Sequence, residues 1–300
     1  MSAIQAKDVT KSFGKIMAID HLSFDIEENK ITGLIGRNGA GKTTLLKLIA
    51  GYLKPTSGEL KVYSQKPFNS LDVSAQTFFV DDNMTFPDSL TLEDILIEVT
   101  RFYANWNYSL ASGLFDYFSF NPKQRHSNLS KGTKSTFNSI LGIASRCPLT
   151  IFDEPTTGMD SAVRKDFYKA LLKDYIEFPR TIILSSHLVS ELEEILEDIL
   201  LMNHGTKRLH LPALELREFA VGIRGNAHVV HGFVEGKEII YQEEFAKESV
   251  YVVLRRELLQ QQLEQIKHTG LEVHSVSTED LCVYLTAKTK GGIDDVFKKG

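Results

Sequence analysis

The sequence predicts an α/β fold in which helices cover a parallel sheet, followed by a smaller α+β unit. Short apolar runs alternate with helical patterns between about residues 149 and 199, as in parallel-sheet proteins. Residues 2–35 are instead rich in strand patterns, and the pattern changes again after Gly205. The chain has 300 residues, 42% of them hydrophobic, which is enough for two units with separate cores.

The N-terminal part is expected to be mostly strand, with one helix. Strand patterns at residues 18–26 and 30–35 precede a Gly-rich turn and a helix that starts near Lys42. Gly51 is expected to end this helix in the left-handed conformation, which glycine adopts without steric cost. A turn at residues 55–58 leads into a further strand.

A helical insertion is predicted over about residues 88–146. Apolar residues recur at helical spacing from Leu92, and a second helical pattern covers residues 110–120. Ser130 can cap a third helix, because its hydroxyl can accept from the free N–H groups of a first turn.

Strands and helices then alternate up to the end of the first domain, which we place at residues 1–210. Strands are predicted at residues 149–152 and 181–185, and Asp160 can cap the helix between them. A further helix is predicted from Leu188 to Ile199. Its acidic residues are interpreted as a solvated face; they are Glu191, Glu193, Glu194 and Glu197.

Residues 211–300 are expected to form a small accessory or regulatory α+β domain, reached through a linker at residues 211–212. The pattern predicts strands at residues 250–254 and 281–285, with a helix at residues 256–268 between them. A unit of this size is marginal by itself, so we expect it to pack on its own first domain or on a partner. A passive extension is the alternative.

Composition excludes several classes of function. The net charge is -5 and the pI is about 6.0, so the chain lacks the basic surface that nucleic-acid binding needs. The two cysteines, Cys147 and Cys282, cannot form a disulfide framework, which favours a reducing compartment. The N-terminus lacks an apolar signal-peptide core, and no apolar run approaches the roughly 20 residues of a membrane helix. A cytoplasmic protein is expected, reaching a membrane only through a partner.

The Gly-rich turn fits the phosphate-binding pattern G-x-x-x-x-G-K-[ST] between a strand and a helix. Its glycines let backbone N–H groups face phosphates, and the helix adds the positive end of its dipole. Lys42 is predicted to contact the β- and γ-phosphates, and the Thr43 hydroxyl to bind Mg²⁺. The predicted ATP contacts are Gly36, Arg37, Asn38, Gly39, Ala40, Gly41, Lys42, Thr43 and Thr44.

The strand at residues 149–152 runs into two carboxylates, Asp153 and Glu154. Ligands bind beyond the carboxyl ends of parallel strands, so both side chains are candidates for the site. Asp153 suits the Mg²⁺ shell through water, and Glu154 can orient and deprotonate the attacking water. Acidic residues after a strand are common, so this pair indicates a nucleotide site only together with the phosphate loop.

These motifs, in this order over residues 1–205, resemble the ABC ATPase family. The motif at residues 129–133, Leu-Ser-Lys-Gly-Thr, is similar to the family signature LSGGQ, and it lies between the two nucleotide motifs. Asp160 lies in a segment that resembles the D-loop, and His187 resembles the switch histidine. Phe13 stands where the family stacks an aromatic ring on adenine.

The resemblance implies a RecA-like P-loop ATPase core with an antiparallel β subdomain and a helical insertion. It implies catalytic roles for Glu154, His187 and Lys42. It also implies a head-to-tail dimer in which each ATP contacts the partner's signature residues, here Ser130, Lys131, Gly132 and Thr133. The second subunit is either a copy of this chain or a related ATPase.

Two positions depart from the family pattern. Asp82 holds the place of the Q-loop glutamine, where its shorter, charged side chain can still bind Mg²⁺ or water. Thr133 replaces the signature glutamine, which is a milder change. Since Lys42, Asp153 and Glu154 are all present, hydrolysis is still expected.

The resemblance implies an ATP-hydrolysing subunit that drives a separate membrane permease from the inner face of the cell membrane. Aromatic residues at 102–108 and the segment at 278–286 are similar to bacterial YtrB-like exporter subunits. A soluble ABC protein acting on ribosomes or DNA is an alternative, but such proteins usually carry two cassettes or a long coiled coil. A regulator that binds ATP and scarcely hydrolyses it is another.

Overall fold

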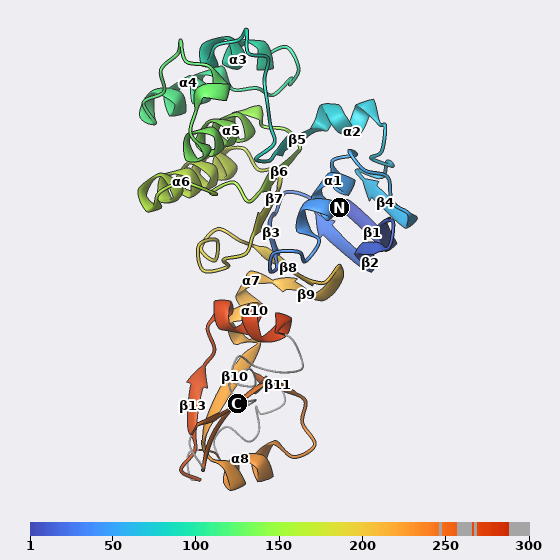
Figure 1. The fold of residues 1–300 in the computed structure, drawn as a ribbon, viewed down its shortest axis with the longest axis vertical. Coiled ribbons are helices and arrows are strands. Elements are labelled where there is room, and N and C mark those ends of the chain that lie inside the picture. The colour runs from blue at the N-terminus through green and yellow to red at the C-terminus, as the bar shows by residue number, and fades with distance from the viewer. Residues whose placement is uncertain (246–247, 257–265, 267–268, 288–300) are drawn as a thin grey trace. The chain divides into compact units, whose positions relative to one another are not determined.

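The computed structural model describes residues 1–245, 248–256, 266 and 269–287. Chain contacts divide it into two compact units, Met1–His210 and Leu211–Gly300 (Figure 1). Among the described residues, no helix is both long enough and apolar enough to cross a membrane.

The first unit is built around a six-stranded sheet in the order β5-β6-β7-β3-β8-β9. Four neighbouring pairs, from β5 to β8, are parallel, as the alternation of strand and helix patterns predicted. β3, β6 and β7 are buried along their whole length, because helices cover both faces of such a sheet. The strands are β3 (Ile31–Ile35), β5 (Thr77–Val80), β6 (Leu149–Asp153), β7 (Thr181–Ser186), β8 (Asp198–Asn203) and β9 (Thr206–Pro212).

A smaller antiparallel sheet, in the order β2-β1-β4, lies beside α1 (Lys42–Ile49) (Figure 1). Its strands are β1 (Ser2–Phe13), β2 (Ile16–Glu27) and β4 (Ser57–Val62). Apolar residues of this sheet and of α1 form one core with residues of the central sheet. Gly51 follows α1 with φ +80°, so the predicted left-handed end of the helix is confirmed.

Helices between β5 and β7 form the insertion and its connection to the core. Ser130 accepts a hydrogen bond from Thr133 N, so the predicted cap of α5 is confirmed. Phe115 and Phe120 stack at 5.4 Å, and both pack edge-on against Phe137. The helices are α2 (Leu71–Gln76, before β5), α3 (Leu92–Val99), α4 (Tyr108–Tyr117), the 3-10 helix η1 (His126–Asn128), α5 (Lys131–Ser145) and α6 (Ser161–Glu177).

The helix predicted from Leu188 to Ile199 is wrong. Residues 189–195 form turns, and Ile199 lies in β8. Val189, Leu192 and Ile195 are buried at helical spacing, but the chain must straighten at residue 198 to pair with β3. The prediction that the acidic residues of this segment form a solvated face is also wrong in part, because Glu191 forms an ion pair with Arg164.

The second unit is a four-stranded antiparallel sheet in the order β11-β12-β10-β13. β10 and β11 flank β12, so β10, α8 and β11 make a split β-α-β unit. Val230 and Val234 of α8 pack on valine, isoleucine and leucine side chains of the sheet. The elements are α7 (Ala213–Glu218), β10 (Ala220–Asn226), α8 (Ala227–Val234), β11 (Ile239–Phe245), β12 (Ser249–Arg255), β13 (Glu272–Ser275) and α10 (Thr278–Thr286).

In this unit the strand predicted at residues 250–254 is confirmed as part of β12. The strand predicted at 281–285 is wrong, because this segment is the helix α10. Ser277 caps α10 through a bond from Asp280 N, and the residues buried on α10 recur at helical spacing. The helix predicted at residues 256–268 lies mostly outside the described residues.

Candidate functional site

The three strands that precede the candidate motifs are neighbours in the central sheet, in the order β6-β7-β3. In the parallel ladder Ile35 lies beside Ser186, and β6 ends at the same level. The residues that follow these strand ends are Gly36, Glu154 and His187. Motifs that are more than 100 residues apart therefore meet at one edge of the sheet, where parallel sheets bind ligands.

The loop between β3 and α1 curls tightly, and two glycines make this possible. Gly41 has φ +100° at the start of α1, and a Cβ there would lie 2.5 Å from the Ala18 carbonyl oxygen. A Cβ on Gly36 would lie 2.6 Å from the carbonyl oxygen of Met202. No side chain caps α1, so the N–H groups of its first turn are available to an anion.

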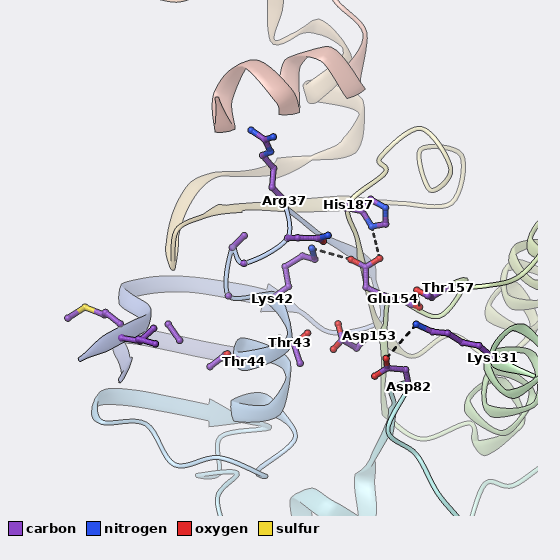
Figure 2. Close-up of a pocket in the computed structure, with 17 residues that line it drawn as sticks. Arg37, Lys42, Thr43, Thr44, Asp82, Lys131, Asp153, Glu154, Thr157 and His187 are labelled. Atoms are coloured by element: carbon purple, nitrogen blue, oxygen red, sulfur yellow. Dashed lines mark hydrogen bonds and ion pairs between the residues drawn. The ribbon is translucent and has the colours of Figure 1, made fainter. Parts of the chain in front are cut away.

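Lys42, Glu154 and His187 form one chain of polar contacts (Figure 2). Lys42 Nζ donates a 2.6 Å hydrogen bond to the Gly36 carbonyl oxygen and lies 3.1 Å from Glu154 Oε1. The other carboxylate oxygen, Oε2, lies 2.9 Å from His187 Nδ1. The contact with Lys42 is an ion pair without hydrogen-bond alignment, and buried Oε1 has no hydrogen-bond partner in the part of the chain described. This oxygen can therefore accept a proton from a water molecule.

The backbone of Glu154 is strained. Its φ is +49°, a region that residues other than glycine rarely adopt and that costs on the order of 1–3 kcal/mol. Its N–H donates a 2.8 Å bond to Ser185 Oγ, and its carbonyl accepts a 2.9 Å bond from the Thr157 hydroxyl. Contacts on both sides thus hold the strained residue, and such strain concentrates at functional sites.

Asp153 is buried and held by hydroxyl groups. Its Oδ1 accepts a 2.6 Å hydrogen bond from Ser185 Oγ, and the Thr43 side chain also hydrogen-bonds to it. Burial raises the pKa of this carboxyl because its charge is poorly solvated, while the bonds from Ser185 and Thr43 oppose the shift. A cation beside Asp153 would stabilise the charged form.

These groups fit Mg²⁺. Proteins hold this ion through one or two carboxylates and substrate phosphates, with water completing the shell. Among the described residues, no three His, Cys, Asp or Glu side chains are placed to hold a metal by themselves. One carboxylate and one hydroxyl, from Asp153 and Thr43, suit a cation that is shared with phosphate oxygens.

A cavity of about 650 Å³ encloses these groups. Ile16, Met17 and Ala18, near the β1–β2 turn, form its apolar wall. Phe13, predicted to stack on adenine, is not among the lining residues; it pairs with Ile16 across the turn and is 48% exposed. The predicted residues in the lining are Arg37, Asn38, Gly39, Ala40, Gly41, Lys42, Thr43, Thr44, Asp82, Lys131, Asp153, Glu154 and His187.

Asp82 and Lys131 both line the cavity and point toward each other (Figure 2). The Lys131 Nζ lies 4.0 Å from Asp82 Oδ2, and both side chains are more than half exposed. Asn83 Nδ2 also donates a 3.1 Å bond to Asp82 Oδ1. Asp82 holds the Q-loop position and Lys131 lies in the signature motif, so this ion pair joins the two segments.

The remaining predicted residues lie outside the cavity of their own chain. Gly36, Ser130, Gly132, Thr133 and Asp160 are not in its lining. Asp160 instead caps α6, accepting 2.9 Å bonds from Ala162 N and Val163 N. The resemblance assigns the signature residues to the ATP of a partner subunit.

The signature helix packs on the loop that follows Glu154. A Cβ on Gly132 would lie 2.1 Å from the carbonyl oxygen of Gly158. Ser135 Oγ donates a 2.9 Å hydrogen bond to the Thr157 carbonyl oxygen. The first turn of α5 and the loop after the candidate base are therefore in direct contact.

Sequence reasoning missed Ser185, Thr157 and the apolar wall. Ser185 is the residue beside Asp153 in the ladder and bridges Asp153 and Glu154. Its position at the end of a buried strand is a signal of the kind that singled out Asp153. The apolar wall carries no such signal, since exposed apolar residues in a hairpin are ordinary.

Known proteins are similar to this chain. Residues 19–157 match the family described as ABC transporter. The energy-coupling factor transporter ATP-binding protein EcfA2 of Clostridioides difficile is 34% identical over 63% of this chain and 70% of its own. The ABC transporter ATP-binding protein YtrB of Bacillus subtilis is 26% identical over 64% of this chain and 66% of its own. The dimeric cassette MJ0796, solved with ADP and Pi bound, aligns with TM-score 0.61 and 21% identity over 70% of this chain and 98% of its own.

Proposed function

The chain belongs to the ABC transporter family, and we propose that it closes with a second ATPase subunit around ATP to drive a separate membrane permease. It is an ATP-binding subunit that hydrolyses ATP in the service of transport. The observation that carries the catalytic assignment is the contact chain of Lys42, Glu154 and His187 beneath the phosphate loop. In phosphoryl transfer to water, Lys42 suits binding of the phosphates, Glu154 suits activation of the water, and His187 suits contact with the γ-phosphate.

Binding of the triphosphate begins at the phosphate loop. The free N–H groups of the first turn of α1 and the dipole of that helix favour phosphate oxygens. Lys42 exchanges its contact with Glu154 for the β- and γ-phosphates, because they carry more negative charge. The apolar wall at Ile16 and Met17 receives the adenine ring, and Phe13 pairs with Ile16 beside it.

Attack on the γ-phosphate requires a positioned water. Glu154 accepts the proton of this water through a carboxylate oxygen, and Oε1 lies 3.1 Å from Lys42 Nζ of the phosphate loop. His187 holds the other oxygen through Nδ1 and can contact the γ-phosphate as it separates. When bound, Mg²⁺ would neutralise phosphate charge; Thr43, Asp153 and Asp82, which all line the cavity, would hold it.

The dimer and the permease are further parts of the proposal. The similar cassette MJ0796 is dimeric with ADP and Pi bound. In a head-to-tail pair, Ser130, Gly132 and the start of α5 present donors to the partner's γ-phosphate. ATP then favours the closed dimer, and its hydrolysis releases it. The relatives named above are parts of transporters, so we place this subunit at the inner face of the membrane, bound to a permease.

The proposal is tested with the purified chain and with membranes of the source cell. We expect Mg²⁺-dependent release of phosphate from ATP, and a dimer in ATP that disappears as ATP is consumed. Affinity purification from detergent-solubilised membranes, followed by mass spectrometry, should recover a protein with several apolar stretches of about 20 residues. Binding of ATP without measurable turnover would instead favour a nucleotide-gated regulator.

A further inference from the structure

Arg164 connects two loops that lie far apart in the sequence. It stands in the first turn of α6, and its NH2 donates a 3.3 Å hydrogen bond to the carbonyl oxygen of Met159. Its NH1 forms an ion pair with Glu191 Oε1. The two side chains are 28% and 21% exposed, so this pair is shielded from solvent much better than Lys131 and Asp82 are.

Both loops carry a residue of the contact chain. Met159 ends the tight loop that follows Glu154, in which Thr157 N donates to the Glu154 carbonyl and Met159 N donates to that of Thr156. Glu191 lies four residues after His187. The two loops therefore meet at two places: at the bond between Glu154 and His187, and again at Arg164.

The contacts of Arg164 matter for the position of His187, because the segment after His187 has little regular structure. Residues 189–195 form turns, held by buried Val189 and Leu192 and by a few local backbone bonds. A cavity of about 740 Å³, lined by Arg164, Tyr168 and Glu191 among others, separates much of this segment from α6. A planar guanidinium bonded at two points fixes the relative position of two loops better than a flexible ammonium would.

We infer that Arg164 and Glu191 are positioning residues for hydrolysis, which hold His187 at Glu154 when the carboxylate accepts the proton. The inference rests on the proposed function, because it concerns the rate of that reaction. Neither residue lines the nucleotide cavity, so neither is expected to contact ATP. Their loss should slow the chemical step and leave ATP binding nearly unchanged.

The test is steady-state ATP hydrolysis by full-length Arg164→Ala and Glu191→Gln. We expect kcat to fall roughly 10-fold or more in each, because small displacements of reacting groups are costly. The KM of each variant should stay within about 3-fold of the wild-type value. The affinity for ATP, measured separately with each substitution in a Glu154→Gln background, should also stay within about 3-fold. Lys165→Ala is the matched control, since it removes a cation from the next position of α6 and from the same cavity wall, and it should be close to wild type.

The double variant separates positioning from general destabilisation. If the pair acts as a unit, Arg164→Ala/Glu191→Gln should lose about as much kcat as either single variant. Arg164→Lys keeps the positive charge but loses the planar guanidinium that bonds at two points, so its kcat should be intermediate. This variant also tests the inference if Arg164→Ala does not fold. Unchanged kcat in folded Glu191→Gln, or fully additive losses, would overturn it. Failure of the wild-type chain to hydrolyse ATP would count against the proposed function instead.

Discussion

Lys42 Nζ lies 3.1 Å from Glu154 Oε1, so the phosphate-binding cation and the proposed base form an ion pair. The lysine side chain is 6% exposed and also bonds to the Gly36 carbonyl oxygen, so it is held in place before the substrate arrives. We expect the phosphate oxygens of ATP to compete with Glu154 for Lys42, leaving the carboxylate to act on water.

Glu154→Gln should bind ATP and scarcely hydrolyse it. The amide keeps the shape of the side chain but accepts a proton very poorly, so turnover should fall at least about 100-fold. ATP affinity should be equal to that of the wild type or higher, because Lys42 no longer has to break an ion pair with residue 154 to bind phosphate. Phosphate release and size-exclusion chromatography in ATP check both points, and an ATP-bound dimer should persist. Turnover near that of the wild type would remove Glu154 from the role of base.

Lys42→Ala is expected to lose affinity for ATP, which Glu154→Gln keeps. Hydrogen bonds to charged groups contribute about 1.5–3 kcal/mol, so ATP affinity should fall roughly 10- to 100-fold. Titration with a fluorescent ATP analogue measures this. A loss of turnover at unchanged affinity would show that Lys42 acts only in the transition state.

Asp82 is expected to act at the metal and not in ATP binding itself. Asp82→Ala should raise the Mg²⁺ concentration needed for half-maximal hydrolysis a few-fold, because one oxygen donor near the cavity is lost. Asp82→Gln should be tolerated, since the amide oxygen can replace the carboxylate oxygen. Mg²⁺ titrations of hydrolysis at fixed ATP test this. If both variants match the wild type, Asp82 is a loop residue paired with Lys131 and nothing more.

Gly132→Ala should impair hydrolysis. The added methyl group would lie 2.1 Å from the Gly158 carbonyl oxygen, so α5 must move away from the loop that follows Glu154. We expect a decrease in kcat of about 10-fold, since the signature and the base are displaced together. Gly113→Ala is the control: it also lies in a helix of the insertion but has open space at the Cβ position. Equal activity of the two variants would contradict the packing argument.

The helical insertion should lose stability in mild acid because of His126. This side chain is 5% exposed and its Nε2 lies 2.8 Å from Asn138 Oδ1, and burial lowers its pKa below the usual 6.5. Below pH 6.5 the unfolded chain therefore binds a proton at His126 that the folded chain does not. The free energy of unfolding is unaffected by His126 above pH 6.5, and it decreases as the pH falls from 6.5 toward the lower pKa of the folded state. Tm measured from about pH 7.5 to about pH 5.5 should fall less in His126→Gln than in the wild type.

Truncation after Pro212 should leave an ATPase and change its assembly. Pro212 ends β9, so the cut preserves the central sheet. The second unit has its own core of α8 and sheet residues and is not expected to bind ATP. We propose that it stabilises or regulates the dimer, so dimerisation in ATP should weaken while turnover per subunit remains within about 3-fold. Unchanged dimerisation, with or without a permease, would leave a passive extension as the explanation.

The local chemistry of this protein could be predicted from the sequence. The phosphate loop, the carboxylates at the end of β6 and the cap of α5 depend on residue types at short spacings, so neighbours in the chain determine them. The helical insertion and the alternation that gives the parallel sheet are also local patterns. Apolar runs of five residues were the weak point: residues 281–285 suit a strand or a helix, and only the cap at Ser277 distinguishes α10.

Contacts across the sheet were decided by the tertiary structure alone. The order β6-β7-β3 brings Lys42, Glu154 and His187 together, and it makes Ser185 the neighbour of Asp153. Glu191 appears from its sequence to face solvent, yet it pairs with Arg164, because the chain after β7 forms turns before it enters β8. The physical reason is that strand pairing and burial join segments by their position in the folded sheet, and the strand order β5-β6-β7-β3-β8-β9 differs from the order of the strands in the chain.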